Sequence, residues 1–344
     1  MKLLLFLLLS GFASAQTLTV SGVVLDENNA TMPGVSVYLD GTSIGVLTDE
    51  KGTFELSVKS RINTNLIISF IGFETVIVEN PFGKRRYEIH MQPKATELRE
   101  VVIGNEGFSR DKKLKAFRAH FLGDTKAGRA CKILNEDDIY FKYDVKTNTL
   151  TAGSDAPLRI SNPYLGYEVT FSLVEFWIEF PYKTVKPETA VGSFYAGTTV
   201  YQEMTGDKKK FSDHRSKSYL GSQMHFFRNL LNNKWGKDDF ELYSGSWPAN
   251  PVEYFTVGGQ SEGVYAVNVK SDAKINSANT LNAPKFYSSF NLMYDRKKQS
   301  KVIFKTPTFH VDEYGNTDSA YEITFGGEMS KLRVGDLLPM DYSQ

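Results

Sequence analysis

The fold of the front of the chain is decided by GVVLD at residues 22–26, PGVSVYLDGT at 33–42, GVLTDEKGTFEL at 45–56 and IISFIGFET at 67–75. Apolar and polar residues alternate in VSVYL and FELSV, and this period of two places one face of each strand in a core and the other in solvent. The nearly continuous apolar run LIISF at 66–70 is typical of a central strand that is buried on both faces.

Turn-forming residues separate these strands. Pro33-Gly34 combines a fixed proline φ with a glycine that accepts positive φ. Asp40-Gly41 is a hairpin signal, and DEKG at 49–52 fits a type I turn that ends on a left-handed glycine. Short strands at this spacing predict a small antiparallel β-sandwich.

These residues resemble the carboxypeptidase-D regulatory-like domain, a transthyretin-like sandwich of seven strands. They are particularly similar to the version that leads many TonB-dependent outer-membrane receptors for glycans in gut-type bacteria. The resemblance runs through residues 17–92, and we place the domain at 16–93. In metallocarboxypeptidases the similar domain is an accessory without catalytic residues. The resemblance therefore implies a fold, and one fold serves many functions.

The N-terminus has the pattern of an export signal. A charged start, Met1-Lys2, precedes an apolar run at residues 3–9, and Ala13-Ser14-Ala15 fits a small-residue cleavage site. We expect residues 1–15 to be a signal peptide and Gln16 to begin the exported chain, which N-terminal sequencing of the mature protein tests. A buried N-terminal helix is the alternative. With the resemblance, export implies a periplasmic or outer-membrane-associated place in a Gram-negative-type envelope.

Composition excludes some classes of function. Lysine plus arginine and aspartate plus glutamate are equal at 40 each, so the charge balance gives no sign of nucleic-acid binding. No window after the leader is long and apolar enough to span a membrane. The one cysteine, Cys131, cannot form an internal disulfide. Its mostly apolar neighbours predict a small buried hydrophobe rather than a nucleophile.

Residues 94–108 are expected to link two domains. ATELREVVIG at 95–104 resembles the segment that joins the same domain to the plug of TonB-dependent receptors. In those receptors a nearby extended segment is captured by the energy-transducing partner through strand addition. Alternatively, VVI at 101–103 is the first strand of the next domain, paired within a sheet.

The second domain, residues 109–344, is expected to be a β-rich α+β domain with about two helices. Apolar residues spaced three and four apart predict one helix at 110–121 behind Ser109 and a second at about 212–232. Strand patterns dominate the rest, so the whole chain is expected to be mainly β. FLG at 121–123 and GSQMHF at 221–226 resemble an uncharacterised region that follows the same leader domain in other exported bacterial proteins. That resemblance implies no activity.

The sequence contains no complete set of metal ligands at a recognisable spacing. Only His310-x-x-Glu313 has the spacing of a zinc carboxypeptidase motif, but no histidine follows it, and in an extended strand the two side chains point to opposite faces. His214 and His225 lie three turns apart on the expected second helix, near one face, without an identifiable third ligand. We expect packed, hydrogen-bonded histidines, and no catalytic residue, metal ligand set or cofactor. The five histidines are His90, His120, His214, His225 and His310.

Aromatic residues offer a different kind of site. Exposed aromatic rings at the edges of a sandwich can stack on sugars, whereas aromatic residues in strands more often belong to the core. Both interpretations remain open for a cluster in the second domain, which comprises Tyr164, Tyr167, Phe176, Trp177, Tyr182, Phe194 and Tyr195.

The sequence favours an exported, non-enzymatic protein of the cell envelope that acts as a binding or assembly module. The expected partner is a glycan or an outer-membrane protein. The alternative is a hydrolase, a peptidase or glycosidase, that carries the regulatory-like domain as an accessory and whose site is scattered along the sequence.

Overall fold

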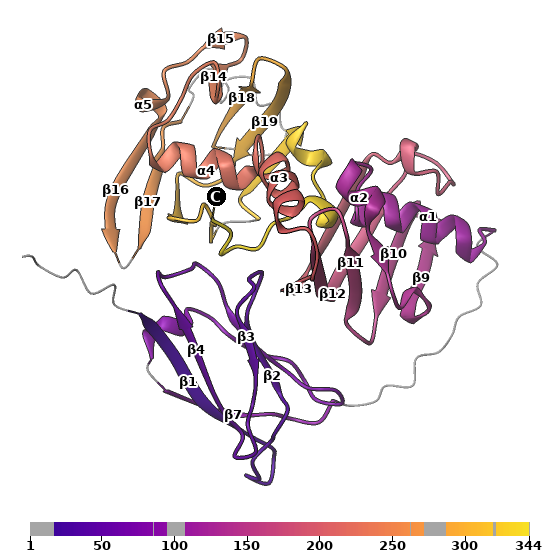
Figure 1. Cartoon of the computed structure of the whole chain (residues 1–344). Helices are drawn as coiled ribbons and strands as arrows, with labels where there is room; N and C mark the ends of the chain where they lie inside the picture. Colours follow the sequence, from indigo (N-terminus) through magenta and orange to yellow (C-terminus); the bar gives the residue numbers. More distant parts are fainter. Residues whose placement is uncertain are drawn as a thin grey trace, which may run out of the picture.

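The computed structural model describes residues 17–84, 86–94, 107–261, 263–271, 287–318 and 321–343. The expected signal peptide, the segment at 95–104 and its alternative strand at 101–103 lie outside these residues. Three units are visible, each with its own hydrophobic core (Figure 1): a front sandwich, a middle unit with α1 and α2, and a third unit around α4. None of the described helices is long and apolar enough to cross a membrane.

The front sandwich has seven strands in two sheets, as predicted. One sheet has the order β4-β1-β7 and the other β3-β2-β5-β6. The expected all-antiparallel pairing is wrong at one place, because β7 runs parallel to β1. The chain enters β7 from the opposite sheet through a short 3-10 turn, η1 (Pro81–Gly83), so no hairpin connects the paired strands. The strands are β1 (Leu18–Leu25), β2 (Ser36–Leu39), β3 (Gly45–Leu47), β4 (Thr53–Val58), β5 (Leu66–Ser69), β6 (Val76–Val78) and β7 (Arg86–His90).

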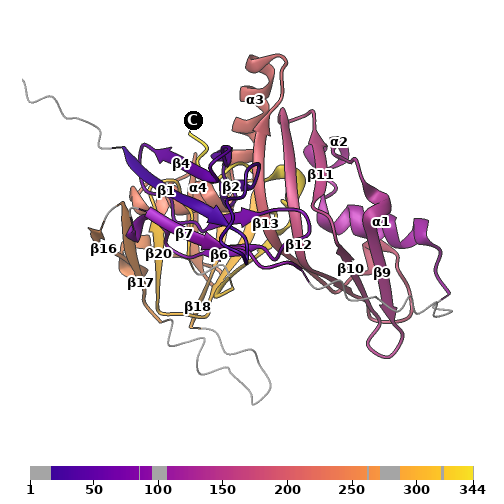
Figure 2. The ribbon, with the colours of Figure 1, turned by 90° about the horizontal axis from the view of Figure 1, so that it is seen from below.

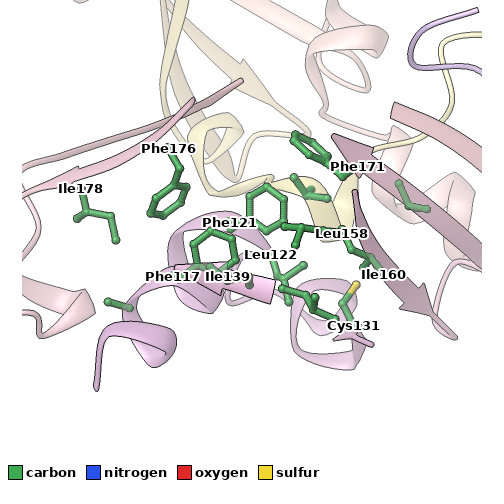
Figure 3. Close-up of a cluster of buried hydrophobic side chains, with 14 of the residues drawn as sticks. Phe117, Phe121, Leu122, Cys131, Ile139, Leu158, Ile160, Phe171, Phe176 and Ile178 are labelled. Carbon is green, nitrogen blue, oxygen red and sulfur yellow. The ribbon is translucent and has the colours of Figure 1, made fainter. Parts of the chain in front are cut away.

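The middle unit is a six-stranded sheet with helices on one face. The order is β8-β11-β12-β10-β9, and β13 pairs along the other side of β12. Helix α1 (Arg110–Phe121) confirms the prediction for these residues and packs Phe117 and Phe121 against Phe176 of the sheet (Figure 3). The other elements are α2 (Lys126–Ala130), β8 (Lys132–Ile133), η2 (Glu136–Asp138), β9 (Ile139–Asp144), β10 (Thr149–Ser154), β11 (Leu158–Asn162), β12 (Tyr167–Glu179), η3 (Pro187–Thr189) and β13 (Gly192–Glu203).

The third unit packs α4 against two sheets, of order β15-β14-β18-β19-β21 and β16-β17-β20. Its helices are α4 (Gln223–Leu231) and α5 (Pro251–Tyr254). Helix α3 (Lys208–Tyr219) precedes them and bonds to the middle unit through His214 and Arg215. Its strands are β14 (Phe240–Ser244), β15 (Trp247–Pro248), β16 (Phe255–Ser261), β17 (Val264–Val269), β18 (Ser288–Tyr294), β19 (Lys298–Phe304), β20 (Thr308–Asp312) and β21 (Ile323–Gly327). The 3-10 turns η4 (Met329–Lys331) and η5 (Val334–Asp336) follow.

The expected helix at 212–232 is wrong in one respect, because it is two helices. Gly221 has φ +82°, which ends α3, and the Ser222 side chain caps α4 by accepting a hydrogen bond from the His225 amide. The mainly β fold is confirmed, but the described residues contain five α-helices, of which α2 and α5 have five and four residues. His214 and His225 therefore lie on different helices and share no helical face.

A turn of the front sandwich, residues 40–43, joins the edge of the middle sheet. The Gly41 amide donates to the Thr199 carbonyl over 2.7 Å, and the Tyr201 amide donates to the Thr42 carbonyl over 2.9 Å. The Asp40 carboxylate accepts the Thr199 amide at 2.6 Å. Together these bonds form a short parallel bridge to β13, and Figures 1 and 2 both show β2 beside β13. The edge strand thus gains a partner from another unit.

The C-terminal segment binds this junction from its other side. The Met340 amide donates to the Gly41 carbonyl over 2.7 Å, and Asp341 accepts both the amide and the hydroxyl of Ser43. Earlier in the same segment, the Gly335 amide donates to the Leu122 carbonyl of the middle unit. The segment therefore contacts the front and middle units after leaving the third.

Replacing Gly41 by valine is expected to destabilise the protein more than replacing Gly34. Both glycines have positive φ, +72° and +74°, so both substitutions carry the same backbone strain. A Cβ at Gly41 would lie 2.5 Å from Met340 Sδ, whereas one at Gly34 meets nothing within 4 Å.

The difference in the free energy of unfolding should be about 1–3 kcal/mol, the usual range for overpacking. Urea denaturation measures it, and Met340→Ala should recover part of the loss in the Gly41→Val protein. Equal losses for Gly41→Val and Gly34→Val would contradict the contact with the C-terminal segment.

Candidate binding surface on the β12–β13 ribbon

Strands β12 and β13 form a long antiparallel ribbon with two different faces. Register pairs run from Tyr167 with Glu203 to Glu179 with Gly192. On β12, Phe171, Phe176 and Ile178 point into the core of the middle unit. Because side chains alternate between faces, Trp177 and its cross-strand partner Phe194 point away from that core.

Three aromatic rings follow one another on this outer side. The ring centroids of Trp177 and Phe194 are 6.0 Å apart with planes 25° from parallel, and those of Phe194 and Tyr321 are also 6.0 Å apart. Tyr321 comes from the third unit and is 67% exposed. We call these three residues the aromatic strip. The strip joins partly exposed rings of the middle unit to an exposed ring of the third.

The rest of the aromatic cluster expected from the sequence divides between other roles. Tyr167, Phe176 and Tyr195 belong to the core of the middle unit or pack against it. Tyr164 stacks on His214 with ring centroids 3.7 Å apart, and Tyr182 is 56% exposed. Sequence reasoning missed Tyr321, because nothing in the chain order brings it close to β12.

A groove of about 530 Å³ lies further along the same outer face, between the front sandwich and the middle sheet. Arg159, Glu168 and Gln202 line it, and the exposed side chains of Leu47 and Leu134 add apolar contacts. Tyr38 lines this groove, and its hydroxyl bonds to Thr198 of β13 at 3.2 Å. Burial raises the Tyr38 pKa, so the hydroxyl keeps its proton.

Three carboxylates that are largely removed from water accept hydrogen bonds from other segments of the chain near this surface. Burial raises the pKa of Asp40 to about 6, although the Thr199 and Gly41 amides oppose the shift. Asp312 is fully buried and accepts the Asn63 amide of the front sandwich at 2.7 Å, and burial raises its pKa as well. Asp336 accepts the Thr125 hydroxyl at 2.7 Å, with its pKa raised to about 6 by burial. Asp40 and Asp312 therefore bond across a boundary between units, and Asp336 ties the C-terminal segment to the middle unit.

The histidines do not converge. His120 bonds to Ser193 and to the Pro187 carbonyl, and burial lowers its pKa. His225 is 4% exposed, and burial lowers its pKa to about 4, so it is neutral at pH 7 and accepts the Gly221 amide.

The remaining three histidines each have a local partner. His90 lies 3.1 Å from Glu88, and His214 lies 2.7 Å from the Tyr164 carbonyl. His310 pairs with Asp318 at 2.7 Å rather than with Glu313. In the part of the chain that the structure describes, no three His, Cys, Asp or Glu side chains gather to hold a metal ion.

Cys131 lies in the core of the middle unit, 9% exposed (Figure 3). Its thiol donates to the Ala127 carbonyl at 3.3 Å, and burial raises its pKa to about 12. A thiol in this state is a poor nucleophile, because the reactive form is the thiolate.

Comparison with known proteins identifies the front unit. Residues 20–103 match the model of the CarboxypepD_reg-like domain. The front sandwich is a CarboxypepD_reg-like domain. The match covers about a quarter of the chain and ends before the middle unit begins.

Two receptors share a segment with this chain. The TonB-dependent receptor SusC of Bacteroides thetaiotaomicron is 38% identical over 77 residues, which are 21% of this chain and 8% of the receptor. The TonB-dependent receptor P3 of Formosa agariphila is 31% identical over 103 residues, which are 29% of this chain and 10% of the receptor. The chain thus spans a tenth or less of each receptor's length.

Stability is expected to fall as the pH rises from about 4 to about 6. Asp40 and Asp336 have folded pKa values near 6, above the ordinary value of 3.8, so the folded state keeps protons that the unfolded state has released. The contribution is complete below about pH 4 and is lost by about pH 6, with a slope of at most about 1.4 kcal/mol per pH unit for each group.

Urea denaturation of Asp40→Asn and Asp336→Asn between pH 4 and 7 measures this slope, since asparagine cannot ionise. The exposed Asp137→Asn is the matched control. If the unfolding free energy of Asp40→Asn and of Asp336→Asn changes with pH as steeply as that of the wild type, these two carboxyl groups are not the cause of the pH dependence.

Proposed function

We propose that this protein is a binding module of the cell envelope and that its aromatic strip holds a glycan. The strip carries the proposal, because three partly or largely exposed rings in a row present the apolar faces on which sugar rings stack. Such a cluster is costly to leave in water unless it is used, and exposed apolar surfaces commonly mark interaction sites.

The envelope location is supported by the front domain. Its similarity is to proteins named TonB-dependent receptors, and the N-terminal pattern of the chain is that of an exported protein. We place the protein in the periplasm or at the outer membrane on these grounds. The front domain then serves as a scaffold, since its turn at 40–43 fixes the ribbon that carries Trp177 and Phe194.

Binding rather than catalysis is favoured by the chemistry of this surface. Around the strip and the groove, the described residues bring together no histidine pair, no reactive thiol and no cluster of metal ligands. The groove instead offers hydrogen-bonding groups, Arg159, Glu168 and Gln202, to a ligand that extends beyond the strip.

Truncating the strip is expected to weaken glycan binding about tenfold or more. Calorimetric titration with maltohexaose, xylohexaose, cellohexaose and a hexagalacturonide should give saturable binding to at least one of them in the wild type. Trp177→Ala and Phe194→Ala should each raise its Kd about tenfold or more, because each removes a ring that is central to the contact.

Trp247→Ala is the matched control, since Trp247 is a 79% exposed tryptophan on β15 outside the strip. It should leave the Kd unchanged. Equal affinities for Trp177→Ala and wild type, absence of binding to all four sugars, or release of reducing ends during incubation would each contradict the proposal.

A further inference from the structure

A second hollow, of about 230 Å³, lies between the middle and third units, away from the aromatic strip. Its wall includes Leu220 and Gly221, the two residues at which α3 gives way to α4. The lining also includes Thr125, Leu332 and Asp336. The residues at the break between the two helices therefore line the cavity.

Four lysines from four separate segments line this cavity: Lys126 of α2, Lys217 of α3, Lys298 of β19 and Lys331 of η4. The acidic residues of the lining are Glu328 and Asp336, so positive charges outnumber negative ones by two in a chain whose net charge is zero. Lys331 pairs with Glu328, and the Lys298 amine lies 5.7 Å from the centre of the Tyr294 ring. Lys126 and Lys217 have no acidic partner among the described residues.

A hydroxyl group inside the cavity also lacks a partner. Ser218 lines the cavity and is only 8% exposed, yet its hydroxyl makes no hydrogen bond to any residue that the structure describes. Among the described residues, the fully buried side-chain polar atoms without a partner are Asn63 Nδ2 and Ser288 Oγ, so the Ser218 hydroxyl keeps access to solvent and a ligand in the cavity can reach it. The neighbouring Asp336 carboxylate, by contrast, is already bonded to the Thr125 hydroxyl.

We propose that this cavity binds a tetrahedral oxyanion, phosphate or sulfate, either as the free ion or as a monoester on a larger molecule. Lys126 and Lys217 supply charge, and ammonium groups bind such anions as compact point charges. The Ser218 hydroxyl donates a hydrogen bond to one oxygen of the anion. The site is independent of the aromatic strip, since the two share no residue.

The test is calorimetric titration of the full mature chain with four probes: inorganic phosphate, inorganic sulfate, glucose 6-phosphate and glucose 6-sulfate, with glucose as the uncharged reference. Saturable binding is expected for at least one charged probe and none for glucose. The Kd should rise with added sodium chloride, because salt screens the lysines.

Lys126→Gln and Lys217→Gln should each raise this Kd about tenfold, and Ser218→Ala should raise it less, since it removes a neutral donor. Lys209→Gln is the matched control, because Lys209 is an exposed lysine of α3 outside the cavity. Lys126 and Lys217 are exposed, so the melting temperature of either variant without ligand should equal that of the wild type and report correct folding.

The two sources of the anion are told apart by the probes. Equal affinity for the inorganic ions and the sugar esters identifies a free ion, whereas affinity at least tenfold higher for an ester identifies a monoester ligand; either result supports the site. No saturable binding to the four charged probes, or a Kd that is the same in Lys126→Gln, Lys217→Gln and wild type, would overturn it. Trp177→Ala should leave this Kd unchanged, because Trp177 lies outside the cavity. The anion site and the glycan proposal can therefore fail independently of each other.

Discussion

Backbone hydrogen bonds between the turn at 40–43 and strand β13 are the constraint on which the arrangement of the units depends. The turn can approach the strand closely because Gly41 accepts positive φ and has no side chain facing Met340. The Gly41 amide then donates to the Thr199 carbonyl, and the Gly41 carbonyl accepts the Met340 amide of the C-terminal segment. The same contact covers part of an edge strand that would otherwise present unpaired backbone groups.

The surfaces that we assign to ligands follow from this packing of units rather than from any single domain. The aromatic strip joins Trp177 and Phe194 of the middle unit to Tyr321 of the third. The lysine-lined cavity likewise draws its residues from both of these units. The buried carboxylates Asp40 and Asp312 hold the front sandwich to the middle and third units respectively. A ligand that touches two units therefore depends on the joints as well as on its own contacts.

Local patterns in the sequence were sufficient for elements whose own residues determine them. The alternating strands and turn residues at 22–75 gave a small β-sandwich, the family resemblance gave its seven strands, and apolar spacing gave α1. The break at Leu220 and Gly221 was missed because the apolar spacing continues across it, although Gly221-Ser222 is a recognisable stop and cap. Tyr321 and the convergence of Lys126 with Lys217 could not be foreseen, since they arise only from contacts between distant segments.

Amide hydrogen exchange at the junction, followed residue by residue by NMR, tests the central claim most directly. Gly41, Thr199 and Tyr201 each donate an amide hydrogen across the boundary between front sandwich and middle sheet. If the turn is docked in solution, these three amides exchange slowly and with similar protection, because one opening event exposes all of them. If the Gly41 amide exchanges as fast as one in an open turn, and the Thr199 and Tyr201 amides are also unprotected, the units do not pack in this way.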